Sequence, residues 1–74
     1  MSAVRQLDVC GLMPPEPFER IMEALDDLPD GDTLEVRIHR QPNPLFEVLR
    51  NHGYRYQCDP TSDGVFLIRI GKVL

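Results

Sequence analysis

Residues 7–17, LDVCGLMPPEP, lead from a short apolar segment into an amphipathic one, and this stretch decides the fold. Gly11 permits a sharp turn after the apolar segment. Pro15 and Pro17 then fall where a helix would begin. Proline is tolerated in a first helical turn because the N–H that it lacks would have no partner there. The stretch therefore predicts a strand that turns directly into a helix.

The residues before and after this turn support the predicted strand and the predicted helix. Residues 4–9 are predicted to form the strand, with Leu7 and Val9 on one face. From residue 16 to residue 28, apolar side chains recur at helical spacing, and charged side chains occupy the opposite face. The apolar positions of this predicted helix are Phe18, Ile21, Met22, Leu25 and Leu28. Residues 29–32, PDGD, then form a turn by their residue chemistry.

A second strand and a second helix follow. Residues 34–38 alternate between apolar and polar, as in a strand with one covered face. Asn43 suits the N-cap of a helix, with Pro44 at the first helical position and Gly53 as its C-terminal cap. The buried stripe predicted for this helix is Leu45, Phe46, Val48 and Leu49.

The chain ends in two predicted strands separated by a loop at residues 59–64. Residues 54–58 form the third strand and residues 65–70 the fourth. The fourth is almost continuously apolar, which predicts a central position in the sheet. The element order is β-α-β-α-β-β, and two right-handed crossovers would place both helices on the same face. The predicted fold class is a two-layer α/β sandwich, and residues 1–74 form a single domain.

The sheet face without helices is predicted to be open and mostly polar. It should carry Glu35, Arg37, Arg55, Gln57, Val65, Leu67 and Arg69. Two interpretations of Val65 and Leu67, which are ringed by arginines, remain open. They would either form a docking patch for a partner or be isolated apolar residues on the surface. Tyr54 and Tyr56 alternate onto the helix-covered face, so they are predicted to be core residues and not platforms for stacking RNA bases.

Composition excludes several classes of protein. The 74 residues suffice for one domain, and the formal net charge of -4 argues against non-specific binding to nucleic acid. No segment approaches the ~20 apolar residues that span a bilayer, and residues 1–7 hold no apolar run of signal-peptide length. A cytoplasmic protein with no membrane partner is therefore expected. Cys10 and Cys58 are too few for a disulfide framework and match no zinc spacing.

The element order and the opening stretch resemble the TusA/SirA-like sulfur-carrier family, whose signature is Leu-Asp-x-x-Gly-Leu-x-Cys-Pro-x-Pro. The matching residues are Leu7, Asp8, Gly11, Leu12, Pro15 and Pro17. Pro14 stands where the family has its persulfide-bearing cysteine. Residues 31–36, 51–54 and 70–72 fit the same frame. The chain looks closest to an uncharacterised branch with Pro-Pro-Glu-Pro at the helix start and His-x-x-Pro-x-Pro-Leu after the second strand, which residues 39–45 reproduce.

The resemblance implies a mixed four-stranded sheet in the order 1-2-4-3, with strand 4 antiparallel to the others. Cys10 and Cys58 would then lie near opposite edges, too far apart for a disulfide, which needs α-carbons within ~7 Å. The family's mechanism needs a thiolate at a helix N-terminus, where the helix dipole lowers the thiol pKa. Proline cannot be a nucleophile, so Pro14 excludes that reaction at its position.

A candidate surface lies at the carboxyl edge of the predicted sheet. The loops at residues 10–14 and 39–44 follow two neighbouring parallel strands, so they should lie side by side, where open α/β sheets often bind ligands. The candidate binding residues are Cys10, Met13, Pro14, Glu16, His39 and Arg40. No residue is assigned a catalytic or metal-binding role, and no cofactor is implied.

The main hypothesis is a non-catalytic binding or protein-interaction module that works through these two loops. Its partner would be an unidentified protein or a small ligand, and no nucleic acid is expected. One alternative is a sulfur or thiol carrier that uses Cys10, with His39 nearby, although a free cysteine is usually structural. Another is metal or small-ligand binding in a redox pathway.

Overall fold

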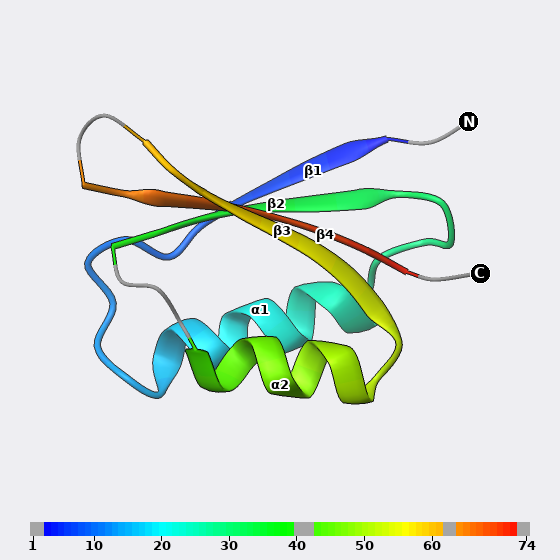
Figure 1. Ribbon diagram of the computed structural model, residues 1–74, viewed down its shortest axis with the longest axis horizontal. Helices are drawn as coiled ribbons and strands as arrows, with labels where there is room; N and C mark the ends of the chain where they lie inside the picture. Colours follow the sequence, from blue (N-terminus) through cyan, green and yellow to red (C-terminus); the bar gives the residue numbers. More distant parts are fainter. Residues whose placement is uncertain (1–2, 40–42, 62–63, 73–74) are drawn as a thin grey trace.

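The computed structural model describes residues 3–39, 43–61 and 64–72, which form a sheet with one helical layer beneath it (Figure 1). The elements in chain order are β1 (Val4–Asp8), α1 (Glu16–Asp26), β2 (Thr33–Ile38), α2 (Asn43–Asn51), β3 (Tyr54–Pro60) and β4 (Phe66–Lys72). No helix in the described ranges is long and apolar enough to cross a membrane.

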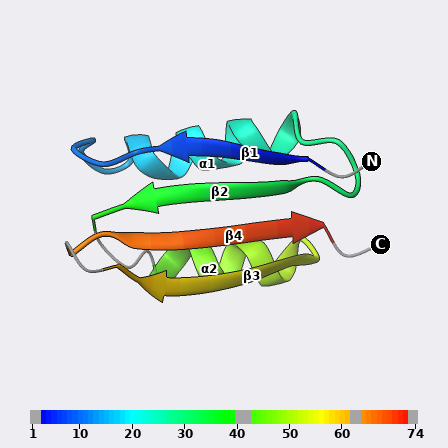
Figure 2. The ribbon, with the colours of Figure 1, turned by 90° about the horizontal axis from the view of Figure 1, so that it is seen from above.

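The sheet has four strands in the order β1-β2-β4-β3 (Figure 2). β1 and β2 are parallel, whereas β4 runs antiparallel to both of its neighbours, β2 and β3. Both helices cover the same face of the sheet (Figure 1). The predicted α/β sandwich, its strand order and the central place of the fourth strand are thus confirmed.

The core lies between the helices and the sheet. Ile21 and Leu25 of α1 and Leu45 and Leu49 of α2 are buried. Below them lie Leu34, Val36, Ile38, Ile68 and Ile70 of the two central strands, together with Val9. The half-buried ring of Tyr56 on β3 stacks on Phe46 of α2, with ring centroids 4.7 Å apart. The tyrosines therefore face the helices, as their alternation predicts.

Two parts of the predicted helical stripe differ from the structure. α1 ends at Asp26, two residues before the predicted end, and Leu28 is buried from the turn that follows, where its N–H donates to the Leu25 carbonyl. Phe18 was expected in the core, but 39% of its surface is exposed. Phe18 lies in the first turn of α1, and there it lines an open pocket instead of packing into the core cluster.

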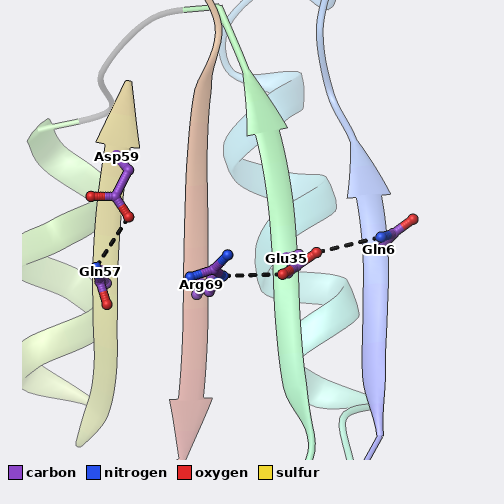
Figure 3. Close-up of polar contacts among 5 residues, drawn as sticks. All are labelled: Gln6, Glu35, Gln57, Asp59 and Arg69. Carbon is purple, nitrogen blue, oxygen red and sulfur yellow. Dashed lines mark hydrogen bonds and ion pairs between the residues drawn. The ribbon is translucent and has the colours of Figure 1, made fainter. Parts of the chain in front are cut away.

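The open face of the sheet carries a row of polar side chains across the strands (Figure 3). Glu35 on β2 accepts hydrogen bonds from Arg69 Nε at 3.1 Å and from Gln6 Nε2 at 3.4 Å. Gln57 on β3 donates to Asp59 on the same strand at 3.1 Å. Exposed ion pairs of this kind contribute less than about 1 kcal/mol each. The row keeps this face hydrated.

Val65 and Leu67 form no apolar patch on the open face, so the alternative of a docking patch there is not supported. Val65 precedes β4 and is only 7% exposed, because the chain turns it inward before the strand begins. The Val65 carbonyl accepts hydrogen bonds from both the N–H and the hydroxyl group of Thr61, and these two bonds stabilise the turn. Leu67 is half-buried and pairs with Arg37 and Asp59 on the neighbouring strands. The open face is therefore predominantly polar.

We expect Leu25→Ala to destabilise the domain severely. Leu25 is fully buried between α1 and the sheet, and truncating such a leucine costs ~2–5 kcal/mol. A domain of this size has a total stability of only ~4–11 kcal/mol. Urea unfolding followed by circular dichroism would measure the loss. Val4→Ala, at a side chain that is 60% exposed, is the control and should shift stability by less than ~0.5 kcal/mol.

Candidate functional site

A pocket of about 430 Å³ opens at the carboxyl ends of β1 and β2, beside the starts of α1 and α2. In Figure 1 these ends lie together at the left of the molecule. One wall consists of residues 11–15, ahead of α1. The other lining residues are Val9, Pro17, Phe18, Ile21, Ile38, His39, Pro44 and Leu45. The pocket thus joins segments that are far apart in the sequence.

The chain between β1 and α1 reaches the pocket through a short hydrogen-bonded turn. The Val9 N–H donates to the Arg37 carbonyl at 3.0 Å, which extends the pairing with β2 beyond the end of β1. Gly11 has a φ of 83°, a left-handed conformation that a side chain would disfavour. The Glu16 N–H then donates to the Met13 carbonyl at 2.9 Å, just where α1 begins. The Pro14–Pro15 peptide bond is cis.

His39 connects the ends of the two parallel strands. It follows β2, and its Nδ1 accepts a hydrogen bond from the Gly11 N–H at 3.1 Å. A neutral imidazole has one donor and one acceptor nitrogen, so this bond assigns the proton to Nε2. His39 is also the only residue with a polar side chain among those that line the pocket within the described ranges. The described part of the pocket lining therefore consists of apolar walls and the polar imidazole of His39.

The walls are stiff, and their rim is apolar. Pro14, Pro15, Pro17 and Pro44 all line the pocket, and proline fixes the backbone φ angle. The Met13 side chain is 77% exposed, so it lies on the surface beside the pocket together with Phe18. Met13 and Phe18 thus add exposed apolar surface to the rim of the pocket.

Cys10 lies outside the lining of this pocket. Its N–H donates to Asp8 Oδ1 at 2.9 Å, and this bond lowers the pKa of the Asp8 carboxyl group. Burial raises the pKa of the Cys10 thiol, and the neighbouring Asp8 carboxylate raises it further. The thiol of Cys58 also has a raised pKa, because of burial and then the charge of Asp59. Both cysteines are free, and both environments favour the protonated thiol.

The structure brings together only part of the set of candidate residues. Met13, Pro14 and His39 line the pocket, whereas Cys10 and Glu16 do not, and Arg40 lies outside the described residues. Sequence reasoning missed Phe18, which its helical spacing had assigned to the core. The proline just inside each helix start was the available signal, because Pro17 and Pro44 both line the pocket. No group of three metal-ligating side chains occurs among the residues described.

Comparison with solved structures places the fold among SirA-like proteins. The structure is similar to the crystal structure of a SirA-like protein from Desulfitobacterium hafniense, with a TM-score of 0.76 over 97% of this chain and 100% of that chain. The two sequences are 22% identical, so the likeness shows the fold alone.

The family follows from the sequence itself. Residues 6–72 match the family described as uncharacterized conserved protein (DUF2249), and the chain belongs to this family. A search of curated proteins found no match.

We expect Cys10 to react slowly with iodoacetamide at neutral pH, because the thiolate is the reactive form and the pKa of this thiol is raised. Removing the carboxylate in Asp8→Asn should shift the pH–rate profile of alkylation to lower pH. Mass spectrometry in a Cys58→Ser background isolates Cys10. The control is Asp59→Asn, which should leave the profile unchanged. If Cys10 reacts faster than free cysteine at neutral pH, the described environment of this thiol is wrong.

We also expect neutral His39 to be the Nε2–H tautomer, because Nδ1 accepts the Gly11 N–H. A long-range ¹H–¹⁵N correlation spectrum distinguishes the two tautomers. His52, which is exposed and follows α2, serves as the internal comparison. A protonated Nδ1 in neutral His39 would contradict the hydrogen bond that joins the two loops.

Proposed function

We propose that residues 1–74 form one non-catalytic binding domain whose pocket receives an apolar side chain of a partner protein. The observation that carries this proposal is the pocket itself, whose lining, as far as the described residues go, is apolar except for His39. Its volume of about 430 Å³ falls within the ~300–1,000 Å³ of pockets that bind small ligands. A leucine or phenylalanine side chain would fill part of this volume and adjoining residues of the partner the rest, and His39 Nε2–H would donate to a backbone carbonyl beside the side chain.

The stiffness of the walls supports a binding role. Ordering a side chain at an interface costs ~0.5–1.5 kcal/mol, and prolines have no such freedom to lose. Four of the lining residues are prolines, so little of the binding energy would be spent on ordering the pocket. Met13 and Phe18, exposed at its rim, would bury additional apolar area when the partner binds.

The resemblance to sulfur carriers is consistent with a change from chemistry to binding. At the position where those carriers have their cysteine, this chain has Pro14, and Pro14 is part of the pocket wall. In this interpretation, an apolar surface at Pro14 stands in place of a reactive thiol. The two reduced thiols suit a cytoplasmic protein.

The alternative of a thiol carrier receives no support from Cys10. Carriers need a thiol whose pKa is lowered, and burial and Asp8 raise the pKa of this one. Among the described residues no hydrogen bond joins the His39 ring to Cys10, and the His39 Nδ1, which could otherwise accept the thiol proton, already accepts the Gly11 N–H. We therefore do not assign sulfur transfer to this domain.

An NMR titration tests the pocket with N-acetyl-phenylalaninamide, which carries one apolar side chain and two carbonyl groups. We expect the amide resonances of Gly11, Phe18 and His39 to shift together and to saturate. The double variant Met13→Ser/Phe18→Ser should weaken binding about 10-fold through lost apolar contact.

The matched control is Val4→Ser, which removes an exposed apolar side chain that does not line the pocket. It should leave the affinity unchanged. If the shifts do not saturate, or if they do not include the pocket residues, the proposed function is wrong.

A further inference from the structure

The negative charge of the protein is concentrated on its helical side. On the open face of the sheet, three arginines (Arg37, Arg55 and Arg69) offset three carboxylates (Asp8, Glu35 and Asp59). Arg5 on β1 forms an ion pair with Asp32, with 3.8 Å between Arg5 Nε and Asp32 Oδ2, so these two charges also cancel. The formal net charge of -4 therefore arises elsewhere, and α1 alone has four acidic residues and one arginine.

The carboxylates of α1 are exposed and form no ion pair within the described part of the chain. Glu16, Glu19, Glu23 and Asp26 are all exposed, and none of them forms an ion pair with another described residue. Glu16 is flanked by Pro15 and Pro17, and Glu19 follows Phe18, so the first two carboxylates lie beside pocket residues. Negative charge that forms no ion pair with the described residues thus borders the apolar pocket.

Helix stability explains only part of this charge. Acidic residues in the first turn, here Glu16 and Glu19, interact favourably with the helix dipole. Asp26 and Asp27 lie at the C-terminal end, where the dipole favours cations, and the last turn has no basic residue. The acidic surface therefore extends along the whole helix. At the C-terminal end its negative charge opposes the helix dipole and so lowers the stability of the helix.

We infer that the partner is a cationic protein segment, in which one apolar anchor residue is flanked by lysine or arginine. This inference rests on the proposed function, since the anchor would occupy the pocket while the flanking cations lie along α1. Complementary charge of this kind raises association rates and rejects partners of the wrong sign. A second copy of this chain, a nucleic acid and an anionic membrane would each meet the acidic helix with negative charge of their own.

The test uses three synthetic peptides of equal length, each with one central phenylalanine flanked by lysines, by serines or by glutamates. Affinities are measured by NMR titration, with the Gly11, Phe18 and His39 amides as reporters of the pocket. We expect the lysine peptide to bind ~10-fold more tightly than the serine peptide at low salt, because several exposed charge pairs form. High salt should remove this advantage.

The variant Glu16→Gln/Glu19→Gln/Glu23→Gln should also remove the advantage of the lysine peptide while leaving the serine peptide unaffected. The matched control Asp59→Asn removes a carboxylate from the open face of the sheet and should change neither affinity.

The outcomes separate the two proposals. If the serine peptide saturates the pocket but the lysine peptide binds no more tightly, the cationic partner is excluded and the proposed function stands. The same conclusion follows if the glutamate peptide binds best. If none of the peptides shifts the pocket amides, the proposed function and this inference both fail.

Discussion

The parallel pairing of β1 with β2 is the constraint on which the site depends. Parallel neighbours end at the same edge of a sheet, so the chain must leave both strands side by side and enter two helices from there. The Val9 N–H extends this pairing by one further bond to the Arg37 carbonyl. The pocket occupies the space between these two exits. It is therefore a consequence of topology, and its chemistry is set by the few residues placed there.

Several of the residues placed there start helices. Pro15 and Pro17 begin α1 without any side-chain cap, and Pro44 occupies the same role in α2. Proline suits the first turn of a helix because it lacks an N–H, and here the same prolines also form apolar walls of the pocket. His39 differs from them, because a helix or strand has no need of an imidazole at this point. Its hydrogen bond to Gly11 holds the loop after β1 against the end of β2.

The spacing of apolar residues and the chemistry of the turns sufficed to predict the architecture. A helix or strand that is buried on one face needs apolar residues at regular intervals, and the sequence shows those intervals. The almost continuously apolar run at residues 65–70 marked the central strand for the same reason. Periodicity fails at the ends of elements, as Phe18 in the first turn of α1 and Val65 just before β4 show. At such ends the burial of a side chain depends on the geometry of the adjoining loop, whereas Leu28 is buried as its spacing predicts although α1 ends before it. The pocket lies at such an end, which explains why only its loop residues were anticipated.

The bond between Gly11 and His39 makes the two loops a single transplantable unit. Moving only one of them onto another α/β scaffold would leave either a glycine N–H or an imidazole nitrogen without its partner. Within the unit, the exposed Met13 is free to vary, since its side chain contributes little to the core. A library built on this domain would therefore hold Gly11 and His39 constant and randomise the rim. Such a scaffold could change its specificity without changing its fold.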